Sequence, residues 1–103
     1  MFAVIFVPGV SWDPARNLED QDGLDGHIEF IRRNRLLGTI IEGAPFHDPG
    51  TQVADDLIGL ALLAIDSVED ARRLIETDPA VQSGALSFRL YPWWEAAWSS
   101  DAR

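Results

Sequence analysis

Hydrophobic and polar positions change period along the chain, and each change marks an expected element. Residues 2–7 are apolar and rich in β-branched side chains, and a proline-glycine pair ends the run, which predicts a buried strand. From about residue 21 to 35, apolar residues recur at helical spacing at Leu24, Ile28 and Ile31. Aspartates near the start and arginines near the end suit the dipole of a helix. A strand followed by an amphipathic helix is therefore expected.

Two further strands are predicted in the middle of the chain. Residues 37–42 are mostly apolar, and Gly43 and Pro45 are expected to close that strand. Residues 57–65 form an apolar run around Gly59 that is too short for a membrane span. This run predicts a third strand that is buried on both faces.

The last third of the chain predicts a helix, a short turn and a strand. Ser67 is a helix N-cap, because its side chain can accept a free N–H of the first turn, and the helix stops before Pro79. Asp78 is expected to cap the short turn over residues 79–83. Residues 85–91 alternate apolar and polar side chains, as a half-buried strand does. The buried stripe of the helix is predicted to contain Val68, Ala71, Leu74 and Ile75.

The order strand, helix, strand, strand, helix, strand predicts a ferredoxin-like α+β fold. Its four-stranded antiparallel sheet carries both helices on one face, and residues 1–103 form one domain. The other sheet face would then be apolar and bare, which predicts a homodimer that packs sheet against sheet. The tail, residues 93–103, carries Trp93, Trp94 and Trp98, which can cover their own chain or reach the second subunit.

Composition and charge exclude several classes of function. Seventeen acidic and eight basic residues give a net charge of −9, which argues against nucleic acid as a partner. The only cluster of basic residues, Arg32, Arg33 and Arg35, is interpreted as a solvated helix end. Cysteine is absent, which removes disulfides, thiolate metal sites and a cysteine nucleophile. The apolar start lacks the basic region of a signal peptide, so a cytoplasmic protein without a membrane span is expected.

Two titratable residues are candidates for chemistry, and each also has a structural explanation. His27 lies three residues after Leu24, on the helix face that should turn towards the sheet. It is either a hydrogen-bonded core histidine or an acid–base catalyst. Asp78 suits an N-cap, yet a carboxylate fixed in this way can also orient a nearby imidazole.

The remaining candidates for a metal or cofactor site have little support. His47 and Asp48 precede Pro49 and Gly50, a composition that a turn explains. A metal site that uses His27 and His47 lacks the ligand spacing that makes such sites recognisable. No glycine-rich phosphate loop or nucleotide fingerprint is present, so neither a metal nor a cofactor is predicted.

Several features follow one another in a recognisable order. They are the apolar first strand, His27 in the first helix, Leu37 with Gly43 and Pro45 around the second strand, Ser67, Glu69 and Ala71 at the second helix, Asp78-Pro79 with Gly84, and Pro92-Trp93 after the last strand. In this order they resemble the YCII-related family of the dimeric α/β-barrel superfamily, over nearly the whole chain. Ala44 separates Gly43 from Pro45, which are adjacent in that family, so the shape of this loop is expected to differ.

The resemblance implies a function for the two candidates. Family members carry a His and Asp pair in a cleft between the sheet and the first helix, which implies that His27 and Asp78 are catalytic. A known activity in the family is cofactor-free dehydrochlorination of a hydroxylated aromatic, which implies proton transfer of a lyase or isomerase type. Pro45, His47 and Trp93 are the implied substrate-binding residues.

Two alternatives stay open at this stage. One is a non-catalytic module that binds a small molecule or supports a partner protein. The other is a haem or quinone oxygenase of the same superfamily, which would need an apolar cavity large enough for that ligand.

Overall fold

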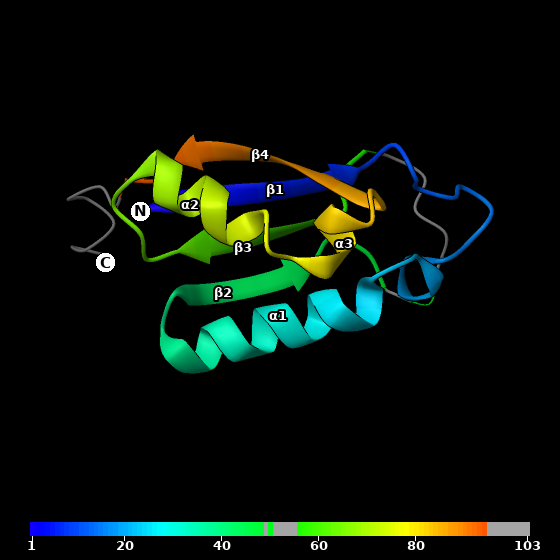
Figure 1. The fold of residues 1–103 in the computed structure, drawn as a ribbon, viewed down its shortest axis with the longest axis horizontal. Coiled ribbons are helices and arrows are strands. Elements are labelled where there is room, and N and C mark those ends of the chain that lie inside the picture. The colour runs from blue at the N-terminus through cyan, green and yellow to red at the C-terminus, as the bar shows by residue number, and fades with distance from the viewer. Residues whose placement is uncertain (49, 51–55, 95–103) are drawn as a thin grey trace, which may run out of the picture.

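Residues 1–48, 50 and 56–94 are described by the structure, a computed structural model. In chain order the elements are β1 (Phe2–Pro8), a 3-10 turn η1 (Leu18–Asp20), α1 (Leu24–Leu37), β2 (Ile40–Pro45), β3 (Gly59–Leu63), α2 (Val68–Ile75), α3 (Pro79–Gln82) and β4 (Leu86–Pro92). The strands form one antiparallel sheet in the order β2-β3-β1-β4 (Figure 1). This order is that of the split βαβ arrangement, so the predicted four-stranded α+β fold is confirmed.

One face of the sheet carries the hydrophobic core. Val4 and Phe6 of β1 and Ala61 and Leu63 of β3 point to the same face, because alternate residues of a strand share a side. They join one buried cluster with residues from the helices. The helical members are Leu24 and Phe30 of α1, Ala71 and Ile75 of α2, and Ala80 of α3. All three helices therefore cover this face, as Figure 1 shows.

The opposite face of the sheet has no covering layer within the described residues. Ile5 of β1 and Leu60 and Leu62 of β3 point to it and are only half-buried. The prediction that this third strand is buried on both faces is therefore wrong for a single chain, because the helices lie on one side. Polar groups on this face lie towards the sheet edges, at Glu42 of β2 and at Ser87, Arg89 and Tyr91 of β4.

Glycines move two predicted boundaries. Helix α1 begins at Leu24, not near residue 21, because Gly23 adopts φ 84° and lies outside the helix. The helix extends to Leu37, where Gly38 ends it with φ 82°, so β2 begins later than predicted. Pro45 lies inside β2 and does not follow it, which is possible because β2 is an edge strand.

The face that α1 buries also differs from the expectation. Its buried residues are Leu24, Phe30 and Asn34, whereas Ile28 is 57% exposed. Position 28 is about 100° round the helix from position 27, so Ile28 lies at the margin of the face that His27 turns towards the sheet. Ser67 caps α2 as predicted, by accepting the N–H of Asp70.

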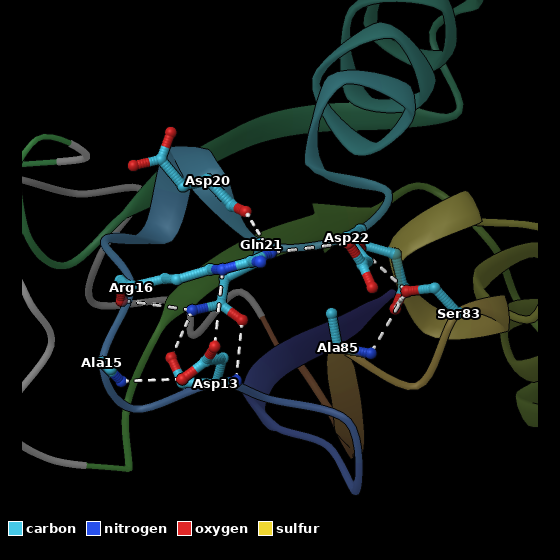
Figure 2. Close-up of polar contacts among 9 residues, drawn as sticks. Asp13, Ala15, Arg16, Asp20, Gln21, Asp22, Ser83 and Ala85 are labelled. Carbon is cyan, nitrogen blue, oxygen red and sulfur yellow. Dashed lines mark hydrogen bonds and ion pairs between the residues drawn. The ribbon is translucent and has the colours of Figure 1, made fainter.

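Gln21 fixes the long connection between β1 and α1. Its side chain accepts the N–H of Asp13 at 2.9 Å and donates to the carbonyl of Asp13 at 2.7 Å (Figure 2). The hydroxyl of Ser83 donates to the carbonyl of Asp22 at 2.8 Å, which ties this connection to the end of α3. The start of α1 is therefore held beside α3.

The tail is described only as far as residue 94. The Trp93 N–H donates to the carbonyl of Met1 at 2.9 Å, and its side chain is 44% exposed. Trp98 and the rest of the predicted tail lie outside the described residues. No helix in the described part of the chain is long and apolar enough to cross a membrane.

Candidate active site

His27 lies one turn into α1 on the side that faces the sheet. Its ring meets the Phe6 ring of β1 edge to face, with centroids 4.9 Å apart and an interplanar angle of 85°. The side chain is 16% exposed, so it is largely enclosed but reaches the surface. The predicted orientation of this histidine towards the sheet is confirmed.

Asp78 both caps α3 and binds the histidine. One carboxylate oxygen, Oδ1, accepts the Ala80 N–H at 2.9 Å, as an N-cap does. The other, Oδ2, lies 2.5 Å from Nδ1 of His27. The Asp78 side chain is fully buried, and a buried carboxylate needs such hydrogen-bond donors. The structure therefore brings the two catalytic candidates into direct contact.

The contact with Asp78 sets the hydrogen-bonding role of each imidazole nitrogen. An ionised carboxylate only accepts hydrogen bonds, so opposite an ionised Asp78 the proton of a neutral imidazole is on Nδ1, which donates to Oδ2. In the part of the chain that the structure describes, Asp78 is the imidazole's only hydrogen-bond partner. A neutral His27 therefore offers Nε2 as a proton acceptor.

Two glycines let α1 approach α3 closely enough for this pair to form. A Cβ on Gly26 would lie 2.7 Å from Cβ and Cγ of Pro79. A Cβ on Gly23 would lie 2.7 Å from the Pro79 carbonyl oxygen. Since His27 follows Gly26 and Asp78 precedes Pro79, this close contact sets the separation of His27 and Asp78.

Gly26→Ala is expected to weaken the contact between His27 and Asp78. The added methyl group must push Pro79 away, and overpacking of this kind costs about 1–3 kcal/mol. The better helix propensity of alanine returns about 1 kcal/mol of that loss. The measurement is the Nδ1 proton resonance of His27 by NMR, which should move upfield or exchange away. Asp25→Ala, at an exposed neighbour, is the control, and an unchanged resonance in Gly26→Ala would contradict this role.

An apolar cavity of about 650 Å³ opens between α1 and the strands β2 and β3, and His27 forms part of its wall. This volume is in the range of small-molecule sites, about 300–1,000 Å³. The aliphatic part of the wall consists of Leu18, Leu24, Ile28, Ile31, Leu36, Ile41, Ala44, Pro45, Ile58 and Leu60. Asp78 is behind the histidine and does not line the cavity. The arrangement suits a flat apolar ligand with a polar group at His27.

The other predicted substrate-binding residues are placed differently. Pro45 lines the cavity. His47 follows β2, is half-buried and is not part of the lining. Trp93 follows β4 at the end of the sheet where Pro92 pairs with Phe2, whereas the cavity reaches β1 at Phe6. Within one chain, the structure unites His27, Asp78 and Pro45 but leaves His47 and Trp93 away from the cavity.

Most residues of the wall were not predicted from the sequence as part of the site. Leu18 and Glu19 of η1, and Arg32 and Arg35 of α1, line the cavity. The spacing does not mark the arginines as site residues, because positions 32 and 35 are about 140° and about 80° round the helix from position 27. No group of three His, Cys, Asp or Glu among the described residues is placed to hold a metal ion.

Comparison with known proteins shows a likeness of fold. The chain is similar to the structure of 5-chloro-2-hydroxyhydroquinone dehydrochlorinase (TftG) from Burkholderia phenoliruptrix AC1100, in complex with 2,5-dihydroxybenzoquinone. The TM-score is 0.61 at 20% sequence identity, and the match covers 93% of this chain and 96% of that one. No family model and no curated protein matches the sequence. Membership of the YCII-related family therefore stays a prediction.

Proposed function

We propose that this protein is a cofactor-free acid–base enzyme of the lyase or isomerase type that acts on a small hydroxylated aromatic. The observation that supports this proposal most directly is the contact between buried Asp78 and Nδ1 of His27 at the wall of an apolar cavity. Asp78 orients the imidazole and stabilises its protonated form, and Nε2 exchanges protons with the substrate. An imidazole suits this role because it gains and loses a proton near neutral pH.

Elimination of HCl from a chlorinated hydroquinone requires only proton movements and loss of chloride. Two hydroxyl protons leave, one proton is added to the ring carbon that carries chlorine, and the C–Cl electron pair departs with chloride. The ring becomes a quinone without an external oxidant. His27 would take a hydroxyl proton at Nε2 and return it to the ring carbon, so one imidazole serves as base and then as acid.

The comparison supports this class of substrate. The dehydrochlorinase of similar fold is named for a chlorinated hydroxyhydroquinone, and its structure holds a dihydroxybenzoquinone. A cavity with aliphatic walls and one imidazole suits ligands of this kind.

The direct test is turnover of 5-chloro-2-hydroxyhydroquinone under anaerobic conditions. We expect chloride release and quinone absorbance with the wild-type protein, and a loss of about 10²–10⁴-fold in His27→Gln, which removes the proton-transfer group. Glutamine can still donate an N–H to Asp78, so the buried carboxylate keeps a partner. The variant Glu76→Gln, at an exposed position, is the control.

Turnover that His27→Gln leaves intact would contradict the proposed role of the histidine. Tight binding of the hydroquinone without any chloride release, by the wild-type protein, would favour the alternative of a non-catalytic binding module.

We also propose that the protein forms a homodimer through the uncovered sheet face. The middle of this face is apolar, with Ala3, Ile5 and Val7 of β1 beside Leu60 and Leu62 of β3. A contiguous apolar surface on a protein with a net charge of −9 is typical of an interface. In such a dimer, Trp93 is close to the sheet edge and can contact the second subunit.

A further inference from the structure

The strongly acidic chain places positive charge in the cavity wall. Four charged or titratable groups line it, namely Glu19, His27, Arg32 and Arg35. From sequence alone, the cluster Arg32, Arg33 and Arg35 is interpreted as a solvated helix end. That interpretation fits Arg33, which is exposed and outside the lining, but not its two neighbours.

These charges are separated along α1. Glu19 belongs to η1, which lies at the N-terminal end of α1, one turn before His27 (Figure 1). Arg32 and Arg35 follow the histidine by five and eight residues, which is about 7.5 and 12 Å along a helix that rises about 1.5 Å per residue. The cavity therefore has an acidic group and the imidazole near the N-terminal end of α1, with Arg32 held beside Glu29 in the middle and Arg35 furthest along the helix.

The two arginines are available to a ligand. Arg32 pairs with Glu29 on its own helix, and both side chains are more than half exposed. Arg35 lies 3.4 Å from Glu42 of β2, a pair that is also about half exposed. Solvent-exposed ion pairs of this kind contribute little to stability, so an incoming anion can replace the glutamates. Guanidinium groups favour carboxylates, because their N–H groups match the two oxygens.

We infer that the preferred ligand is a hydroxylated aromatic that also carries a carboxylate, with its hydroxyl at His27 and its carboxylate at Arg32 and Arg35. The inference deepens the proposed function and rests on it for the role of His27. Glu19 repels the carboxylate from the histidine end, so the ring binds in one orientation. The aliphatic side chains of Ile28 and Ile31, on the same helix, cover the ring between the two ends.

The test compares binding of 2,5-dihydroxybenzoate with binding of 1,4-dihydroxybenzene, by isothermal titration calorimetry at neutral pH. We expect the wild-type protein to bind the carboxylate about tenfold more tightly, because charge-assisted hydrogen bonds are stronger than neutral ones. This preference should shrink as salt is added, since the arginines are exposed to solvent.

Variants separate the arginines from the rest of the site. The double variant Arg32→Gln/Arg35→Gln is expected to lose the tenfold preference while it keeps its affinity for 1,4-dihydroxybenzene. Arg33→Gln removes the same charge one residue away and should keep the preference. Equal affinity of the wild-type protein for the two compounds, no binding of either, or a preference that survives in the double variant would overturn the inference.

A further variant distinguishes the inference about ligand binding from the proposed reaction. His27→Gln should retain the preference for the carboxylate, because it leaves both guanidinium groups in place. A carboxylate preference in a protein without His27-dependent turnover would uphold the binding inference and reject the proposed enzyme activity.

Discussion

Asp78→Asn is expected to lower kcat/KM for 5-chloro-2-hydroxyhydroquinone by about 10²–10⁴-fold without unfolding the protein. The carbonyl oxygen of asparagine can still accept the Ala80 N–H, so the cap of α3 survives. The amide nitrogen would then face Nδ1 of His27 and donate to it. The proton of a neutral imidazole would move to Nε2, and the base would point a proton at the substrate where it should accept one.

The exchange of tautomers can be measured without any substrate. Long-range ¹H–¹⁵N NMR correlations distinguish the protonated ring nitrogen from the unprotonated one. We expect the proton of the neutral His27 imidazole to be on Nδ1 in the wild-type protein and on Nε2 in Asp78→Asn. Asp70→Asn, an exposed aspartate of α2, is the control. If His27 keeps the same tautomer in both proteins, Asp78 does not orient it.

Ile5→Glu is expected to convert a wild-type dimer into a monomer of 11.4 kDa. Ile5 lies at the centre of the uncovered sheet face, so the substitution would bury two like charges in a sheet-to-sheet interface. Arg89 is its cross-strand neighbour on β4 and can pair with the new carboxylate, which helps the monomer to fold. Sedimentation equilibrium gives both masses directly.

A matched control distinguishes an effect at the uncovered sheet face from a general effect of added negative charge. Leu37→Glu places the same charge on a residue that is 71% exposed at the end of α1, and it should leave the dimer intact. A wild-type protein that sediments as a monomer at high micromolar concentration would reject the proposed homodimer. A folded dimer of Ile5→Glu would locate the interface elsewhere.

Much of the fold could be predicted from local signals in the sequence. Short apolar runs identified three strands, alternation of apolar and polar residues identified the fourth, and Ser67 and Asp78 identified helix caps that the structure contains. These signals depend on a few neighbouring residues, so they are readable from a single sequence. The limits of α1 and β2 were less accurate, because left-handed glycines at positions 23 and 38 decide them.

The pairing of His27 with Asp78 was partly predictable. The helical position of His27 and the capping role of Asp78 each followed from local sequence, but their contact joins residues 51 positions apart. That contact depends on the approach of Gly26 to Pro79, which no local pattern shows. His47 lies in the loop after β2, and Trp93 lies after β4 at the end of the sheet away from the cavity. Residue type alone does not predict where such positions lie relative to a cavity.

One helix supplies the proton-transfer group and most of the residues that would choose the ligand. Within the 14 residues of α1, Leu24, Phe30 and Asn34 maintain the core, whereas positions 24, 27, 28, 31, 32, 35 and 36 meet the cavity. Except at Leu24, the two sets do not overlap. Ligand preference can therefore diverge by substitutions on one stripe of a single segment while folding stability and proton transfer are preserved. Transplanting that stripe onto another protein of this fold would transfer its selectivity as a unit.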